Sequence, residues 1–430
     1  MGLSLPGRPV GRLLGVFLLA LAAAACSEKH ELLTWRDAPR GLLGEIDSLA
    51  ADTLVVAESF SRVDVPTGAA GYFLAGVVDR AGGSVTAKAF LRWDLTQLPS
   101  GTIVAAHMEM HLSGVDEPEA DGTGRYAVRI FEVLESWSEE SLNALGPPAV
   151  DAGVPWGEAT IDTTGLAAAG RVLLQPNLFA GTDPMTGLLA LARRWQAADS
   201  LNHGLMLRPR SDSERAWLRF FSSEGQPSGS SAALSTPLLV LEIQGDETST
   251  ISLEAVADAY AIDVEGDPIA LPEGALLVSS GLVHHAMLRL ELPPPLAPAP
   301  AGRTAAYAIL RGLLTLRLDT ASEWRLREGE SMTVSLFDAD VDWGQADPWP
   351  NAALHELLDR VTVAAGDTTV AFAVGPHLQG LLEGNRRTLV LQSDSATDRL
   401  RSLVLQGAGA EASRPRIEIG FAPRLDRLGG

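Results

Sequence analysis

Short runs in which apolar and polar residues alternate recur along most of the chain, and this period of two constrains the fold more than any other feature. One run is TIVAAHMEMHL, residues 102–112. If it is extended, one face is apolar and the other carries histidine and glutamate. The apolar face comprises Val104, Ala106, Met108, Met110 and Leu112, and the polar face His107, Glu109 and His111. Such alternation indicates an antiparallel strand with one buried and one solvated face.

Similar runs, separated by clusters of Gly, Pro, Asp and Ser, continue through the chain, and helical patterns are few. Residues 183–199 form the clearest helical pattern, in which Asp183 is placed to cap the helix and Pro184 lies in its first turn. The apolar residues at helical spacing there are Leu188, Leu189, Ala192 and Trp195. We predict an all-β protein of jelly-roll-like antiparallel β-sandwich type, with one or two short helices.

The second half of the chain repeats pieces of the first half in the same order. AFLRWDL, residues 89–95, matches AMLRLEL, residues 286–292. YAVRIFEVLESW, residues 126–137, matches MTVSLFDADVDW, residues 332–343. Five segments match in this way, which argues against chance. We therefore predict two tandem sandwich domains, the second a diverged copy of the first.

The predicted domain boundaries follow from these matches. Residues 1–25 are expected to be a signal peptide and residues 26–45 a polar tether. The first sandwich domain is predicted over residues 46–247 and the second over residues 248–425, with the boundary near QGDETST. At 430 residues the chain is long enough for two cores.

The N-terminal region predicts export. Arg8 and Arg12 precede an apolar run, residues 13–25, which is too short to span a bilayer as a helix. The run ends in LAAAAC, which resembles the lipobox of bacterial lipoproteins, although Ala23 stands where Leu is preferred. The resemblance implies lipidation at Cys26, and Ser27 after it implies sorting to the outer membrane, on its periplasmic or cell-surface side. The alternative is an ordinary signal peptide with an incidental cysteine.

The composition limits how the domains can be stabilised and which partners the chain can bind. Cys26 is the only cysteine, so no disulfide is expected to stabilise either domain. Removal of residues 1–25 takes away two arginines and moves the net charge from −21 to about −23. Such a charge repels phosphate backbones, so nucleic acid is not an expected partner.

The order of short motifs in the first half resembles the DNRLRE-type domain, a family of β-sandwich modules on secreted bacterial and archaeal proteins. The match covers roughly residues 50–243. It is carried by Phe90, Leu91, Arg92, Trp93, Asp94, Leu95, Leu98, Pro99, Gly101, Ile103, Ala106, Met108, Leu112, Trp137, Glu139, Trp195, Asn202, Gly204, Leu205, Leu207, Phe221, Ser222, Ser223, Glu224, Pro237 and Leu239. The family is related to carbohydrate-binding modules and disaggregatase repeats, so the resemblance implies a sandwich fold and polysaccharide as the ligand class. In the second copy Leu290 and Glu291 replace the aromatic residue and the aspartate, so a function that needs those two residues is not expected there.

Two polar pairs lie at matching positions in the copies. Arg92 and Asp94 are neighbours on the same face of one expected strand, and Arg289 and Glu291 are their counterparts. We predict that these residues form structural ion pairs, with one another or across strands, with a functional site as the alternative.

Catalytic and metal sites are poorly marked. No GxSxG motif is present, and His107 and His111 are about 13 Å apart on an extended strand, too far to share a metal. Asp338, Asp340 and Asp342 fall on one strand face, where a structural calcium ion would offset their repulsion. The competing interpretation is a solvated strand end.

Four tryptophans near strand ends or in loops are candidates for a sugar-binding rim, since sugar rings stack on exposed aromatic faces. They are Trp137, Trp156, Trp343 and Trp349. The alternative is that each closes one end of a sandwich.

These features predict a lipid-anchored protein of the cell envelope with a non-catalytic binding or display role, and polysaccharide is the leading ligand class. A structural spacer or an adhesin that contacts envelope proteins is the second hypothesis. A polysaccharide-degrading enzyme is the third. Exposed tryptophans on one face would favour sugar binding, and buried tryptophans would favour the spacer.

Overall fold

The computed structural model describes residues 47–49, 56–62 and most of 67–423. The gaps within the last range are 69, 81–82, 119–121, 143–145, 167–171, 182, 184, 225–235, 267–273, 283, 293–295, 297, 300–304, 323, 340–354, 386–387, 395–400 and 408–414. The chain divides into two units, residues 1–48 and 49–430. The short strand β1 (Asp47–Leu49) lies at their boundary, and everything described below belongs to the second unit. Among the described residues no helix has both the length and the apolar character needed to cross a membrane.

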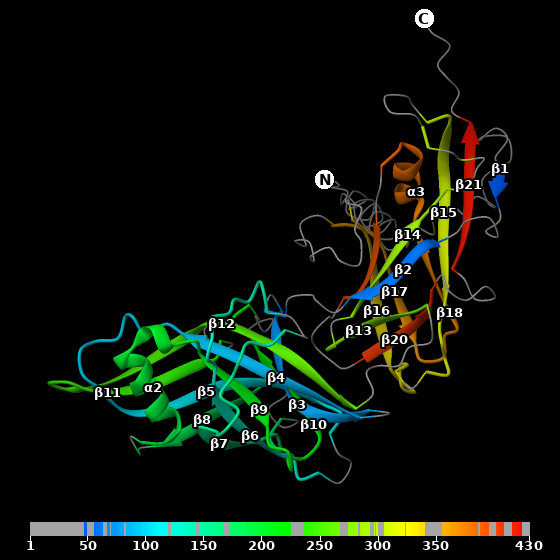
Figure 1. Cartoon of the computed structure of the whole chain (residues 1–430). Coiled ribbons are helices and arrows are strands. Elements are labelled where there is room, and N and C mark those ends of the chain that lie inside the picture. Colours follow the sequence, from blue (N-terminus) through cyan, green and yellow to red (C-terminus); the bar gives the residue numbers. More distant parts are fainter. Residues whose placement is uncertain are drawn as a thin grey trace, which may run out of the picture. The chain divides into compact units, whose positions relative to one another are not determined.

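The protein is all-β, as predicted, with antiparallel strands and two α-helices in the part that the structure describes (Figure 1). The strands up to residue 244 are β2 (Val56–Arg62), β3 (Tyr72–Arg80), β4 (Gly83–Trp93), β5 (Thr102–Asp116), β6 (Arg125–Glu132), β7 (Gly157–Asp162), β8 (Leu173–Gly181), β9 (Leu205–Pro209), β10 (Ala216–Phe221) and β11 (Leu238–Gln244). The later strands are β12 (Thr248–Gly266), β13 (Ala275–Ser280), β14 (His285–Leu290), β15 (Tyr307–Arg317), β16 (Ser331–Ala339), β17 (His355–Ala364), β18 (Thr369–Ala373), β19 (Thr388–Ser393), β20 (Arg401–Gln406) and β21 (Arg416–Pro423). Helix α2 (Gly187–Ala197) and the 3-10 helix η2 (Asp199–Leu201) precede β9, and α3 (Gly375–Leu382) precedes β19.

Both halves of the chain have the same strand order. In the first half β4, β9, β6 and β7 are neighbours in a sheet, and in the second half β14, β19, β16 and β17 follow in the same sequence. The remaining pairs also correspond, since β3–β10, β5–β11 and β5–β8 have counterparts in β13–β20, β15–β21 and β15–β18. The repeated segments of the sequence therefore occupy equivalent places in two similar sandwiches.

The first strand of each copy pairs with the other copy. β2 precedes the first-half strands in the chain but pairs with β14, and β12 precedes the second-half strands but pairs with β4 and β11. In Figure 1 the blue strand β2 accordingly lies among the later strands, and the green strand β12 lies beside the blue strand β4. We call β3–β11 with β12 the first sandwich, and β13–β21 with β2 the second sandwich. The halves thus exchange equivalent edge strands within one chain.

The exchange corrects the predicted boundaries of 46–247 and 248–425. Residues 56–62 complete the second sandwich, and residues 248–266 complete the first. The two strands contain VAESFS and VADAYA, in which Phe60 and Tyr260 hold the same position. Alternation of residues reveals that a segment is a strand, but any sheet edge of matching pattern can accept it, so the partner was not predictable from the local pattern.

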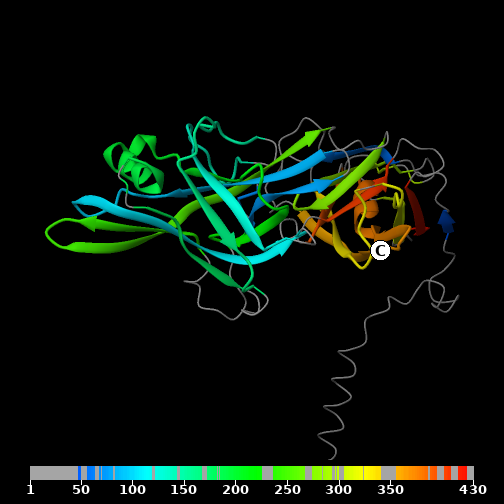
Figure 2. The same cartoon turned by 90° about the horizontal axis from the view of Figure 1, so that it is seen from below.

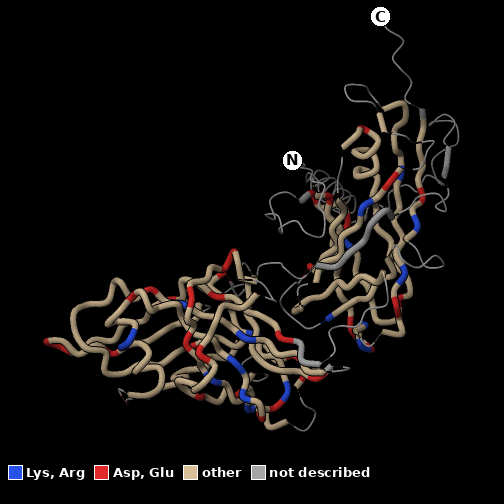
Figure 3. Tube along the Cα trace, viewed as in Figure 1, with Lys and Arg blue, Asp and Glu red and all other residues tan. Residues whose placement is uncertain are grey.

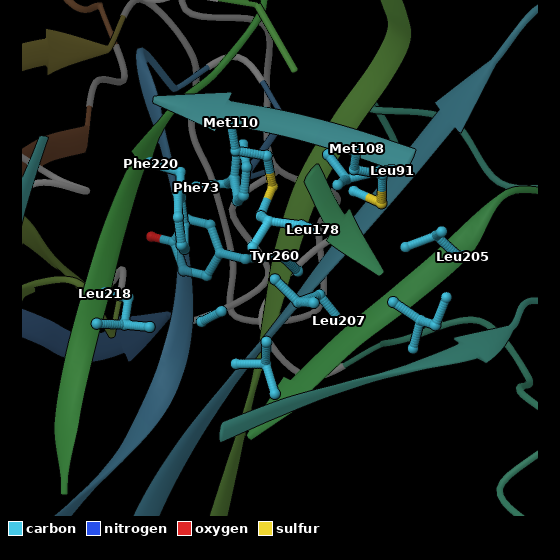
Figure 4. Close-up of a cluster of buried hydrophobic side chains, with 14 of the residues drawn as sticks. Phe73, Leu91, Met108, Met110, Leu178, Leu205, Leu207, Leu218, Phe220 and Tyr260 are labelled. Atoms are coloured by element: carbon cyan, nitrogen blue, oxygen red, sulfur yellow. The ribbon is translucent and has the colours of Figure 1, made fainter. Parts of the chain in front are cut away.

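The core of the first sandwich is a continuous set of apolar side chains from both layers (Figure 4). Strand β12 contributes Tyr260, which is fully buried and donates a hydrogen bond from its hydroxyl to the carbonyl of Gly281. The predicted apolar face of β5 is confirmed from Ala106 to Leu112, but Ile103 replaces Val104 in the core because a bulge shifts the register there.

Helix α2 lies on the outside of the strands at one end of the first sandwich (Figure 2). The predicted apolar residues Leu188, Leu189, Ala192 and Trp195 are all buried. The helix begins at Gly187, however, three residues later than predicted, because Asp183 accepts hydrogen bonds from the amide of Met185 and the hydroxyl of Thr186 and so forms a turn instead of a cap.

Candidate functional site

Three carboxylates meet beside β12 in the first sandwich, and we call Glu139, Glu224 and Asp258 the carboxylate cluster. Glu139 follows Trp137 after β6, Glu224 follows β10, and Asp258 lies on β12. One oxygen atom of each lies within 4.8 Å of the others. Glu139 thus meets Asp258, which is 119 residues away in the chain, because of the strand exchange.

Backbone amides hold the carboxylate cluster together. The amide of Asp258 donates a hydrogen bond to Oε1 of Glu139 at 2.6 Å, and the amide of Ser223 donates to Oδ2 of Asp258 at 2.7 Å. The backbone of Gly68 approaches Glu139 so closely that a Cβ at residue 68 would lie 2.4 Å from the Cβ of Glu139. The positions of two carboxylates are thus fixed by the fold rather than by solvent.

Burial and like charge determine the protonation of the carboxylate cluster. Asp258 is 1% exposed, and burial together with the charges of Glu224 and Glu139 raises its pKa to about 7, against two hydrogen bonds from Ser223 that lower it. Burial also raises the pKa of Glu139, which a hydrogen bond from the amide of Asp258 and the nearby charge of Arg92 partly offset. Near neutral pH the cluster therefore holds or releases a proton readily.

The carboxylate cluster also has the ligand chemistry that calcium prefers, since Ca²⁺ takes oxygen atoms from carboxylates and backbone carbonyls. Three carboxylates would supply part of its usual six to eight ligands. Sequence reasoning connected Glu139 and Glu224 with the DNRLRE-like motifs but missed Asp258, because it assigned residue 258 to the second domain. The signal that could have found it is the match of VADAYA with VAESFS, which places an acid on both exchanged strands.

Trp137 is not part of an exposed rim, so that prediction is wrong. It is 7% exposed, and its indole nitrogen donates a hydrogen bond to the carbonyl of His203 at 2.8 Å. Its ring packs edge-on against Phe90 at 6.1 Å between ring centroids and carries the guanidinium of Arg92 at 5.7 Å. Trp137 thus closes one end of the sandwich over a small apolar cluster.

Trp156 is half-buried and packs against the first core, with its amide bonded to the carbonyl of Ile130. Trp343 and Trp349 lie outside the described residues, as does Cys26. The rim prediction therefore stays open only at Trp156 and at the two tryptophans that the structure does not describe.

Asp338 contradicts the solvated strand end that was one interpretation of the DADVD segment. It is 2% exposed and contacts His377 of α3, with 3.1 Å between Oδ1 and Nδ1. Its side chain lies on the same face of β16 as Val334 and Leu336, which are core residues, and the calcium interpretation stays a prediction. Asp340 and Asp342 lie outside the described residues.

The predicted pairing of Arg92 with Asp94 is also wrong. Arg92 donates a hydrogen bond to the carbonyl of Trp137 at 3.2 Å. Asp94 is exposed and accepts hydrogen bonds from the amide and hydroxyl of Thr96, which lower its pKa and begin the turn after β4. In the second copy Arg289 is half-buried and its register partner on β2 is Glu58, whereas Glu291 is exposed beyond the end of β14.

A second candidate surface lies on the side of β4, β9, β6 and β7 that faces away from the core, which we call the outer face. An open hollow of about 430 Å³ is lined there by Arg125, Ala127, Thr160, Asp162 and Arg210. The hollow exists because the side chain of Ala127 is short, whereas the residues two positions before and after it on β6 are the much longer Arg125 and Arg129. Side chains around the hollow offer both hydrogen-bond donors and acceptors.

Ion pairs order the walls of the hollow. Arg125 pairs with Asp162 at 3.4 Å, and Arg129 pairs with Glu158 at 2.9 Å. Arg210 contacts both Glu158 and Asp212, and these arginines lower the pKa of Glu158 by hydrogen bonding. The hollow is therefore polar and already organised without a ligand.

Comparison with known proteins adds little to this geometry. No family model matches the chain, and no curated protein matches it. A solved structure that it resembles is a "putative secreted protein" from Parabacteroides distasonis, with 8% identity over 87% of this chain and 100% of that chain and a TM-score of 0.18. A TM-score this low supports no argument about fold or function, and the DNRLRE resemblance stays a prediction.

Proposed function

We propose that this chain is an exported, lipid-anchored protein of the cell envelope that binds polysaccharide through the outer face of its first sandwich. The observation that carries the proposal is the hollow lined by Arg125, Ala127, Thr160, Asp162 and Arg210. Its volume is within the range of small-ligand sites, and its lining can both donate and accept hydrogen bonds, as sugar hydroxyls require. The motif resemblance and the lipobox-like end of the N-terminal region support the ligand class and the location.

The proposal can be tested by filling the hollow. Ala127→Gln places a longer side chain at its floor, and Thr369→Gln is a matched control at an exposed position of β18 in the second sandwich. Binding of the chain from Glu28 onward to a panel of neutral and acidic polysaccharides should be lost with Ala127→Gln and kept with Thr369→Gln. Loss or retention in both variants alike would rule out the hollow as the site.

A structural spacer or adhesin is the second candidate, and the burial of the tryptophans favours it. Four of the described tryptophans, Trp93, Trp137, Trp195 and Trp217, are at most 7% exposed, so none of these offers a face to a sugar ring. A spacer would bind none of the polysaccharides in the panel, and Ala127→Gln would then have no effect on any interaction. Binding of intact envelope fractions after enzymatic removal of their polysaccharides would support the spacer.

A further inference from the structure

Three basic residues form a row across neighbouring strands of the outer face. Arg208 on β9 is the direct register partner of Arg129 on β6, and Arg129 in turn faces Glu158 on β7. Ala89 is the partner of Leu207, so the same antiparallel register continued by one residue places Lys88 of β4 beside Arg208. We call Lys88, Arg208 and Arg129 the cation row. Figure 3 shows Lys and Arg positions, drawn blue, among the strands of the first sandwich.

The members of the cation row differ in how their charge is offset. Lys88 forms an ion pair with Asp263 of β12, and Arg129 forms one with Glu158. Within the part of the chain that the structure describes, Arg208 has no carboxylate partner, and its recorded contact is with the ring of Phe131 at 5.5 Å. Like charges directly opposite one another on adjacent strands are destabilising. An anion beside Arg208 would relieve this repulsion.

The seat of Arg208 leaves its hydrogen-bond donors available. The guanidinium carbon of Arg208 lies 5.5 Å from the centroid of the Phe131 ring, a contact that uses none of its N–H groups, which lie at the edges of the guanidinium plane. A guanidinium in this position binds a carboxylate through two parallel hydrogen bonds. Since Arg208 is half-buried, a charge-assisted bond there is screened less by salt than one at a fully exposed arginine.

We propose that the cation row binds the carboxylate groups of an acidic polysaccharide. Adjacent strands are about 4.8 Å apart, so Arg208 lies between two further basic side chains that are already ion-paired, and it is the member whose charge is left for a carboxylate of the polymer. The hollow lies next to the row, since Arg210 follows Arg208 by two residues on the same face. With a net charge of −21 the chain repels such a polymer elsewhere, which directs it to this face.

This inference rests on the proposed function and names the class of polysaccharide. The test is calorimetric titration of the protein with an oligomer of galacturonic acid and with the same oligomer after methyl esterification, which removes the charge and keeps the sugar. Arg208→Gln is the test variant, and Arg317→Gln makes the same charge change at an exposed position of β15. Thermal melting of each variant establishes that it is folded.

We expect the acidic oligomer to bind at least about tenfold more tightly than its methyl ester, and Arg208→Gln to remove most of this difference while Arg317→Gln preserves it. Arg208→Lys should retain part of the affinity, because it keeps the charge but loses the paired hydrogen bonds. Equal binding of acid and ester, or unchanged binding by Arg208→Gln, would overturn the inference while polysaccharide binding itself stands. Binding of polyglutamate as tight as that of the acidic oligomer would also overturn it. If no polysaccharide binds at all, the proposed function fails first.

Discussion

Each sandwich buries an acidic residue near the end of an equivalent strand, β6 or β16. A basic residue on the equivalent helix contacts this acid in both sandwiches, but it is arginine in the first and histidine in the second. Glu132 of β6 pairs with Arg194 of α2 at 3.3 Å, and Asp338 of β16 pairs with His377 of α3 at 3.1 Å. Their register partners, Leu205 and Leu389, are themselves equivalent, because they pair with Leu91 and Leu288. The copies thus share an ion pair between sheet and helix as well as a strand order.

The difference lies in how each pair is exposed. The side chain of Arg194 is 44% exposed, so water reaches one partner of the first pair. Both side chains of the second pair are at most 1% exposed. Burial raises the pKa of Glu132 despite Arg194. We therefore expect loss of Arg194 to lower the stability of the fold less than loss of His377, since removal of a partner from a buried charge is strongly destabilising.

The strand exchange provides the largest test of the comparison between the halves. A fragment of residues 46–247 has all the strands of the first copy but lacks β12, which contributes Tyr260 and several alanines to the interior. We expect this fragment to aggregate or to show no cooperative thermal transition, because the edges of β4 and β11 are uncovered. A fragment of residues 67–266 contains the complete first sandwich and should melt cooperatively. Circular dichroism and size-exclusion chromatography distinguish the two, and cooperative melting of the 46–247 fragment would contradict the exchange.

The pH dependence of stability should come mainly from Asp258 in the first sandwich. Its pKa is about 7 in the folded chain and 3.8 in the unfolded chain. Between these values the folded state retains a proton that the unfolded state has released, so stability falls as pH rises from about 4 to about 7 and is level above that. Three pKa units correspond to a loss of about 4 kcal/mol.

Asp258→Asn isolates this effect, since the asparagine keeps an oxygen that can accept the hydrogen bond from Ser223 and carries no charge. The melting temperature of the variant should change little between pH 5 and pH 8, while that of the parent falls. The measurement is made with a chelator present, so that no divalent cation compensates the carboxylates. Asp94→Asn at an exposed turn serves as the control and should leave the parent profile unaltered. A flat parent profile would show that the carboxylate cluster does not hold this proton.

Removal of the base from each sheet-to-helix ion pair should have unequal effects. His377→Ala removes the ring nitrogen that contacts the buried carboxylate of Asp338 and should lower the free energy of unfolding by about 3 kcal/mol. Arg194→Ala should cost about 1 kcal/mol, because water reaches the partly exposed end of that pair. Urea denaturation measures both, and adding Asp338→Asn to His377→Ala should recover part of the loss. Equal losses would mean that the two pairs are not buried differently.

The sequence allowed the strands, the repeat and most of the core to be predicted, because these depend on local alternation. In β4, for example, alternation places Leu91 and Trp93 in the main core and Phe90 on the other side. What could not be predicted depends on which segments meet. Asp338 was taken for a surface acid because its partner His377 is thirty-nine residues away, and Asp258 was overlooked because its strand belongs to the other sandwich.

The smallest expected effect concerns Arg92 and Asp94, which the sequence paired and the structure separates. Since Arg92 contacts Trp137 and lies near Glu139, Arg92→Gln should lower stability by about 1 kcal/mol. Asp94→Asn should change stability by less than about 0.5 kcal/mol, because its bonds to Thr96 are exposed and an asparagine can form the same turn. The two losses of stability should then add in the double variant. In a true ion pair, the second substitution would lower stability less once the first partner is absent. A coupling energy above about 0.5 kcal/mol in urea denaturation would show that Arg92 and Asp94 do form an ion pair. Additive losses would indicate that Arg92 stabilises the first sandwich through its contact with Trp137.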